Sequence, residues 1–147
     1  DILKAQEQLK ETHYFIIKLH PHSQLHVPGT NCSIPSEELL PVADVVITDY
    51  SSILFDAMIY RLPVILFTPD LEEYINSRGF YLDYHTLPGI FTRNSEQLIS
   101  SLNDEATLKS SVSQSYFEFF ARYMSACDGH ATQRIMEYII KPNNNRR

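Results

Sequence analysis

The sequence predicts an α/β fold with a mostly parallel sheet and helices on both faces. Short apolar runs at residues 14–17, 44–48 and 63–67 have the composition of buried strands. An apolar helical segment, 53–60, joins the second run to the third. Two strands joined through such a helix are parallel. This strand–helix–strand unit is therefore the core of the prediction.

The first third of the chain supplies one further strand and two helices. Residues 2–11 predict a helix, and the continuous β-prone run 14–17 predicts a buried strand followed by a polar loop. Ser36 is the N-cap candidate of a short helix that ends near Pro41 or Val42.

The last half is mainly helical. Residues 71–76 predict a short helix and residues 90–91 a short last strand, after which Asn94 or Ser95 caps a helix to about Leu102. One longer helix and a final helix follow. The longer helix carries the apolar stripe Leu108, Val112, Tyr116, Phe119 and Tyr123, and the final one carries Ala131, Ile135, Tyr138 and Ile139.

Length and composition favour a single domain over residues 1–141, with a disordered polar tail at 142–147. The formal charge of −6 argues against a nucleic-acid-binding surface. No apolar run is long enough to cross a bilayer, so a soluble domain is expected. Cys32 and Cys127 are isolated, which fits a reducing cytoplasm better than a disulfide framework.

Candidate ligand-binding residues follow the strands, because ligands of open parallel sheets bind beyond the carboxyl ends of strands. Asp49, Ser51 and Ser52 open the helix after the second strand. Its unpaired N–H groups and two hydroxyls predict an anion site. Alternatively, Asp49 or Ser51 only caps this helix.

Lys18 and His20 follow the first strand, where a cation and an imidazole can face the same anion and either neutralise a departing phosphate or pass a proton. A solvated loop is the alternative. His20, His22 and His26 share one loop without an interleaved cysteine or carboxylate, so we predict no metal.

Two later pairs are open to two interpretations. Arg78 and Gly79 either place a guanidinium near a phosphate or form a surface bend. Asp128 and Gly129 either present a carboxylate to sugar or polyol hydroxyls or start the final helix. The absence of GxGxxG, P-loop and GxSxG motifs excludes the dinucleotide oxidoreductase, P-loop kinase and α/β-hydrolase interpretations.

The ordered strings IIKLHPHS, LLPVADVVITDYSSILFDAMIYRLPVILFTPDLEEY, RGFYLDY, LPG and DGHAT span most of the chain. In this combination the sequence resembles the CDP-glycerol glycerophosphotransferase family of teichoic-acid synthesis. The resemblance implies the C-terminal, donor-binding domain of a GT-B fold, in which two Rossmann-like domains enclose the active site.

The resemblance also implies residue roles. His20, in a Lys-x-His-Pro motif that begins at Lys18, belongs to the catalytic set and stabilises phosphate charge. Thr48, Ser51 and Ser52, in the TDYSS motif, contact the diphosphate of the donor.

Asp128 and Gly129 match the family's late DG motif near the donor, whereas Ile90 follows LPG where the family usually has proline. The acceptor-side domain of the family, with a second essential histidine and a membrane-binding surface, is absent from this sequence. This fragment alone is therefore expected to be inactive.

The expected activity is transfer of a polyol phosphate from a CDP-linked donor to a polymer or lipid-linked primer through the missing N-terminal domain. No cofactor is implied, and the full-length protein is expected to be cytoplasmic and peripheral at the inner face of the membrane. The alternatives are a sugar-nucleotide-binding domain of a GT-B glycosyltransferase and a non-catalytic doubly wound binding module.

Overall fold

A computed structural model describes residues 2–19 and 33–140. Its sheet contains the three parallel strands β1 (Val46–Thr48), β2 (Val64–Phe67) and β3 (Ile90–Thr92), in the order β1-β2-β3. Ile65 on the central strand pairs with both Ile47 and Ile90. The predicted parallel sheet and the last short strand are thus confirmed.

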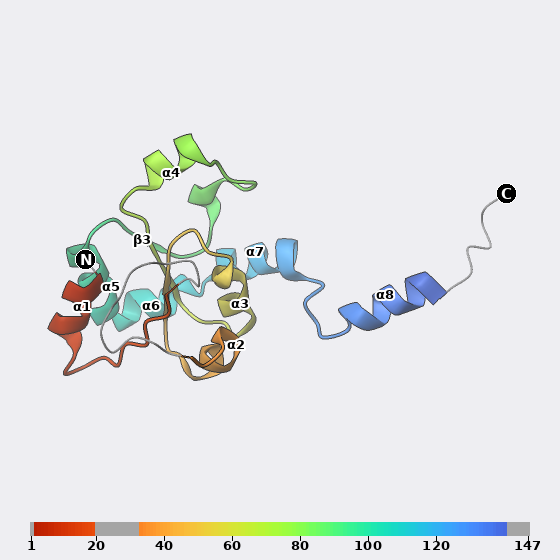
Figure 1. Cartoon of the computed structure of the whole chain (residues 1–147), viewed down its shortest axis with the longest axis horizontal. Helices are drawn as coiled ribbons and strands as arrows, with labels where there is room; N and C mark the ends of the chain where they lie inside the picture. The colour runs from red at the N-terminus through yellow and green to blue at the C-terminus, as the bar shows by residue number, and fades with distance from the viewer. Residues whose placement is uncertain (1, 20–32, 141–147) are drawn as a thin grey trace.

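Eight α-helices and two short 3-10 helices accompany the sheet in the described residues (Figure 1). The α-helices are α1 (Ile2–Leu9), α2 (Ser36–Leu39), α3 (Ile53–Ile59), α4 (Leu71–Ser77), α5 (Ser95–Asn103), α6 (Glu105–Ser111), α7 (Gln114–Met124) and α8 (Ala131–Ile140). The 3-10 helices are η1 (Leu40–Val42) and η2 (Tyr84–Thr86).

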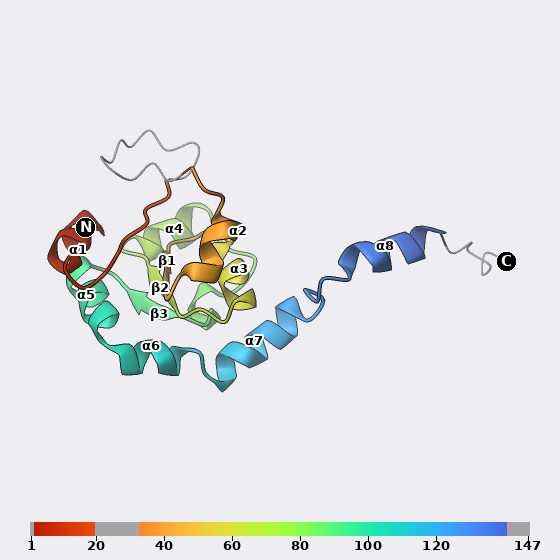
Figure 2. The same ribbon diagram turned by 90° about the horizontal axis from the view of Figure 1, so that it is seen from below.

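Side chains of β2 alternate between two hydrophobic cores, one on each face of the sheet. Val64 and Leu66 pack in a core with α3 and with Tyr116 of α7. Ile65 packs in the other core, with α1 and α5. Figure 2 shows α1 and α5 on the opposite side of the sheet from α3. Because fully burying one large apolar side chain stabilises a fold by about 1.5–3 kcal/mol, both layers of helices are held firmly to β2.

The predicted strand at residues 14–17 is wrong in this structure, which assigns no strand there. Within this segment, Phe15 packs against the core of α1 and α5. Tyr14 is 93% exposed and Ile16 is 47% exposed. A fully buried strand is covered on both faces, whereas here only alternate side chains face the core. The apolar composition of residues 14–17 therefore overestimated how deeply the segment is buried.

The predicted long helix after Leu102 is two helices, α6 and α7, separated at Val112 and Ser113. Val112 has φ −82° and ψ 64°, which is not a helical conformation. The break has a packing reason. Leu108 contacts the core of α1 and α5, whereas Tyr116 enters the core of α3 on the opposite face, and one straight helix could not serve both.

The helix starts confirm one predicted cap and correct another. Asn94 Oδ1 accepts a hydrogen bond from the Gln97 N–H at 2.9 Å, so Asn94 caps α5. Ser36 is instead the first residue of its helix, after Pro35, and no side chain caps it. The Pro35 side chain has no hydroxyl or amide group that could cap the helix. This short helix is therefore held by the packing of the following Leu40.

α8 extends away from the sheet and its helices, and none of its residues is buried (Figures 1 and 2). Across residues 2–19 and 33–140, no helix has the length and apolar character needed to span a membrane. The predicted disordered tail at 142–147 lies outside the described residues.

Candidate functional site

The candidate site is the turn that carries the chain from β1 into α3. β1 ends at Thr48, which is partly buried, and Asp49, Ser51 and Ser52 are exposed in the turn. Ser51 Oγ accepts a hydrogen bond from the Ile53 N–H at 3.3 Å. Ser51, rather than Asp49, therefore makes the local bond to the helix start that the capping interpretation anticipated.

Ser52 is the N-cap residue of α3 by position, with φ −66° and ψ −8°, yet its side chain makes no capping hydrogen bond. Its main-chain oxygen accepts from the Phe55 N–H at 2.9 Å, which closes the first turn. The Ser52 hydroxyl is therefore exposed and not committed to the cap, so it is available to a ligand.

Two tyrosine hydroxyls attach this turn to the rest of the domain. Tyr84 donates a hydrogen bond to the main-chain oxygen of Asp49 at 2.7 Å. Tyr50, inside the turn, donates to Asp70 Oδ1 at 2.6 Å. Asp70 precedes α4 at the end of the neighbouring strand, so the segments that follow β1 and β2 are joined directly.

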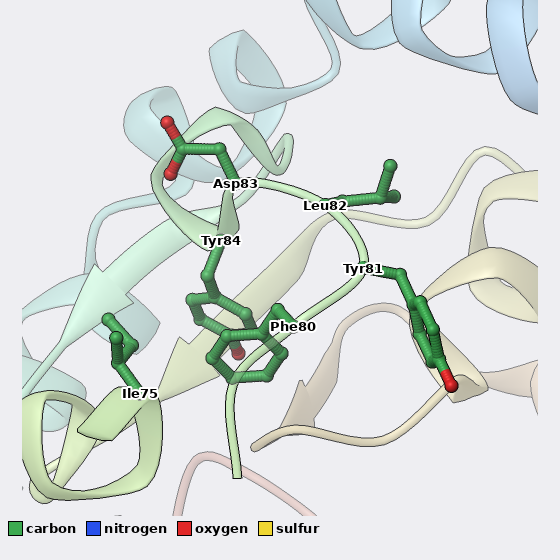
Figure 3. Close-up of a pocket in the computed structure, with 6 residues that line it drawn as sticks. All are labelled: Ile75, Phe80, Tyr81, Leu82, Asp83 and Tyr84. Atoms are coloured by element: carbon green, nitrogen blue, oxygen red, sulfur yellow. The ribbon is translucent and has the colours of Figure 1, made fainter. Parts of the chain in front are cut away.

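An aromatic cluster of Tyr50, Tyr74, Phe80 and Tyr84 packs behind the turn. Tyr50 and Tyr74 stack with ring centroids 3.8 Å apart, and Phe80 stacks on Tyr84 at 4.6 Å. Figure 3 shows Phe80 and Tyr84 together, with Tyr81 pointing away from them. Phe80 and Tyr84 thus pack in the core, whereas Tyr81 is fully exposed.

Burial of the Tyr84 ring and the nearby Asp49 carboxylate raise the pKa of the Tyr84 hydroxyl. Burial and the hydrogen bond to Asp70 raise the pKa of the Tyr50 hydroxyl. Both phenols are consequently neutral hydrogen-bond donors across the physiological pH range.

Arg78 lies at the edge of this cluster. It follows α4, and its guanidinium lies 5.6 Å from the centre of the Tyr74 ring. Tyr74 in turn stacks on Tyr50, so one aromatic ring separates Arg78 from the turn. Arg78 is exposed, and Gly79 beside it has φ +69°, so the pair also forms the predicted bend. The role of Arg78 in donor binding stays a prediction.

Of the predicted residues Lys18 and His20, the structure describes only Lys18. The Lys18 ammonium donates to the main-chain oxygen of Ile34. His20, the predicted catalytic residue, lies outside the described residues, as do His22 and His26. The role of Lys18 in donor binding stays a prediction.

Asp128 and Gly129 lie in the connection between α7 and α8, beyond the sheet (Figure 1). The Asp128 carboxylate pairs with the Arg134 guanidinium at 2.8 Å and accepts from the His130 N–H at 3.0 Å. These bonds hold the pKa of Asp128 below its usual value, with the Arg134 bond as the largest cause. Here Asp128 serves the start of α8, and its predicted contact with the donor stays a prediction.

Sequence reasoning missed the two tyrosine anchors. Tyr50 lies inside the TDYSS motif, but nothing in the motif shows that its hydroxyl reaches Asp70. Tyr84 and Asp49 are separated by 35 residues, and their bond depends on the position of η2 beside β3. A tyrosine at that distance gives no local signal.

The arrangement can bind an anion through neutral donors. Exposed hydroxyls of Ser51 and Ser52 lie at the start of α3, where the Ile53 N–H is bonded to Ser51 Oγ and the Phe55 N–H to the Ser52 main-chain oxygen. Two exposed carboxylates, Asp49 and Asp70, lie close by and oppose an anion electrostatically. A bound diphosphate would therefore need cations from beyond this turn to offset its charge.

Comparison with known proteins identifies relatives of this chain. It is 31% identical over 153 aligned residues to the teichoic acid poly(ribitol-phosphate) polymerase of Bacillus spizizenii, covering 97% of this chain and 24% of the relative. It is 30% identical over 135 aligned residues to the teichoic acid glycerol-phosphate transferase of Staphylococcus aureus, covering 90% and 35%. The chain thus spans a quarter to about a third of the length of these relatives.

The fold is similar to that of the wall teichoic acid polymerase TagF. One TagF structure has a TM-score of 0.76 and 26% identity over 95% of this chain and 36% of the TagF chain. A variant soaked with CDPG for 30 minutes gives 0.75 at the same identity, over 95% and 37%. The sequence model described as CDP-Glycerol:Poly(glycerophosphate) glycerophosphotransferase matches residues 1–141. This chain therefore belongs to the CDP-glycerol:poly(glycerophosphate) glycerophosphotransferase family.

Proposed function

We propose that this chain is the donor-binding part of a transferase that moves a polyol phosphate from a CDP-linked donor to a teichoic-acid-type polymer or its primer. The observation that carries the proposal is the family match over residues 1–141 together with the placement of the TDYSS motif. That motif lies at the carboxyl end of β1 with its serine hydroxyls exposed. The TagF structure soaked with CDPG supports a CDP-linked donor.

In this proposal the turn after β1 holds the diphosphate of the donor. Thr48, Ser51 and Ser52 donate hydroxyl hydrogen bonds to this diphosphate. Such bonds to a charged acceptor are stronger than neutral ones. Arg78 is one ring away from the turn and supplies positive charge on the side of α4.

Lys18 and His20 complete the proposed charge balance. As a diphosphate ester breaks, negative charge increases on the departing CMP, and a cation or protonated imidazole that faces it lowers the barrier. The negative charges of Asp49 and Asp70 repel the donor diphosphate, so these cations are needed to offset the repulsion. We assign catalysis to His20 and donor binding to Lys18.

The acceptor is assigned to the part of the protein that this chain does not contain. The relatives are about three to four times longer than the region they share with this chain. We propose that an N-terminal domain binds the polymer or lipid-linked primer at the inner face of the membrane. Asp128 and Gly129, on the connection to α8, are proposed to approach the donor when that domain is present.

The test is titration of the 147-residue chain with CDP-glycerol, CDP and a UDP-sugar, followed by amide chemical shifts. We expect selective binding of the cytidine diphosphates, with shift changes at residues 48–53. Ser52→Ala removes one hydrogen bond to a charged group, worth about 1.5–3 kcal/mol, and is expected to weaken CDP-glycerol binding by about tenfold or more.

Ser110→Ala is the matched control, since Ser110 is an exposed helical serine whose hydroxyl bonds only to the Thr107 main-chain oxygen of α6. It should leave CDP-glycerol binding unchanged. Preference for the UDP-sugar would replace the proposal with a glycosyltransferase function. Failure of every nucleotide to bind, or equal effects of the two serine variants, would contradict a donor site at this turn.

A further inference from the structure

The hydroxyl of Tyr84 contacts the main chain of the candidate site from outside it. It donates to the main-chain oxygen of Asp49 at 2.7 Å, the residue directly after β1. The Tyr84 side chain is only 4% exposed, so water competes poorly for this bond. The bond is therefore a fixed link between two distant parts of the chain.

Tyr84 is itself held in place by its own short helix. It opens η2, whose start is capped when Asp83 Oδ1 accepts from the His85 N–H at 3.0 Å. Thr86 Oγ1 donates to the Asp83 main-chain oxygen at 2.7 Å. These local bonds fix the backbone from which the Tyr84 side chain extends.

Neighbouring rings then fix the side chain. Phe80 stacks on the Tyr84 ring at a centroid distance of 4.6 Å, and the Phe91 ring of β3 meets it edge-on at 5.9 Å. In Figure 3 the Tyr84 side chain points to the opposite side from the Asp83 carboxylate, toward Phe80. A ring confined on two sides has little rotational freedom, so its hydroxyl occupies a defined position.

Two hydrogen bonds, one from Tyr84 and one from Tyr50, constrain the turn. The Asp49 carbonyl belongs to the peptide plane that also contains the Tyr50 N–H, so holding the oxygen sets the direction of the chain that enters the turn. The Tyr50 hydroxyl supplies the second anchor, through Asp70 at 2.6 Å. Ser51 and Ser52 follow immediately and are exposed.

We propose that Tyr84 is a positioning residue of the donor site, which acts by holding the Asp49 carbonyl so that the Ser51 and Ser52 hydroxyls face the donor diphosphate. This inference rests on the proposed function and adds a residue outside the TDYSS motif to the site. Tyr84 does not contact the donor in this proposal. Its effect is pre-organisation, which strengthens binding by reducing the ordering that the ligand must impose.

Tyr84→Phe tests the inference, because it removes the hydroxyl and keeps the ring. Tyr116→Phe is the matched control. Tyr116 is 1% exposed, belongs to the same hydrophobic core, and donates to a main-chain oxygen, that of Leu62, at 3.1 Å. Leu62 precedes β2, at the end of the sheet opposite to the turn. Both variants lose one buried tyrosine–carbonyl bond, and only one of these bonds involves the turn.

We expect Tyr84→Phe to raise the Kd of the 147-residue chain for CDP-glycerol by about three- to tenfold, the equivalent of one lost hydrogen bond. Tyr116→Phe should change the Kd by less than about twofold, although both variants should lower the urea midpoint to a similar degree. Unchanged affinity in Tyr84→Phe, or an equal loss in Tyr116→Phe, would overturn the inference.

A second measurement separates this inference from the proposed function. Amide hydrogen exchange of residues 50–53 needs no ligand, and we expect it to be faster in Tyr84→Phe than in the wild type and unchanged in Tyr116→Phe. If wild-type chain does not bind CDP-glycerol, the proposed function fails, and the donor role of Tyr84 fails with it. If the wild type binds but exchange at the turn is the same in all three proteins, only the positioning role fails.

Discussion

Gly89→Ala should destabilise the sheet through a contact that can be read directly from the structure. A Cβ on Gly89 would lie 3.1 Å from Cγ and Cδ1 of Leu66 and 3.1 Å from the main-chain oxygen of Val64. Ordinary contacts of a Cβ begin at about 3.4 Å, so the neighbours must move by a few tenths of an ångström. Leu66 is fully buried on the central strand β2, and the Val64 oxygen belongs to the backbone of the same strand. Neither atom group can therefore move away easily.

Overpacking of this kind costs about 1–3 kcal/mol. Alanine also restricts the unfolded chain, which returns about 0.4–1 kcal/mol. The net loss in the free energy of unfolding is therefore about 1–2 kcal/mol. For a domain of this size each kcal/mol corresponds to about 2–4 °C, so we expect the Tm to fall by about 2–8 °C.

The assay is urea unfolding followed by circular dichroism, with the midpoint compared at an unchanged m-value. Gly129→Ala is the control. Gly129 has φ +80°, which strains any L-residue, but nothing lies within 4 Å of its added Cβ, and it joins α7 to the unburied α8. Its cost should therefore fall on the start of α8 and leave the sheet unaffected. An equal or higher midpoint for Gly89→Ala would refute the packing argument.

Three further outcomes follow from particular contacts. Asn94→Ala should destabilise the domain by about 1 kcal/mol because α5 loses its N-cap, whereas Asn94→Gly should cost only a few tenths, as compared by urea midpoints. The free energy of unfolding should be constant below pH 10.0 and fall above it. Above that pH the unfolded chain releases phenolic protons, whereas in the folded chain burial raises the pKa of Tyr84, and that of Tyr116 to about 12, so both tyrosines keep their protons. Urea midpoints from pH 8 to about 11 measure this, and a flat profile would contradict it. Arg134→Gln should speed amide exchange in α8 by breaking the pair with Asp128, without changing the midpoint of the sheet, and a lower midpoint would show that α8 is coupled to the core.

The sequence determined the elements whose signals are local. The strand–helix–strand unit around α3 was predictable because β-branched runs and an intervening apolar helix specify parallel pairing without knowledge of the rest. Asn94 was one of two cap candidates because capping depends on a residue and its next three neighbours. The position of the TDYSS turn was also predictable, since it lies directly between a strand end and a helix start.

Tertiary structure decided the features that depend on what covers a segment. Residues 14–17 have the composition of a strand, yet Tyr14 is 93% exposed, because burial depends on neighbours that a local pattern does not contain. The stripe from Leu108 to Tyr116 has helical spacing, but its two ends serve cores on opposite faces of the sheet, which requires a break. The spacing of apolar residues predicts that a residue is buried, but it does not predict against which layer of the fold the residue packs.

The same distinction separates the two parts of the candidate site. Its serines were visible in the motif, whereas the bond from Tyr84 to the Asp49 carbonyl exists only because the tertiary fold brings the Tyr84 side chain to the residue that follows β1. A hydrogen bond between residues 35 positions apart is set by the geometry of the assembled sheet and not by either residue's neighbours. The sequence therefore determined which groups lie in the turn after β1, and the tertiary packing of an aromatic cluster decided which bonds hold that turn.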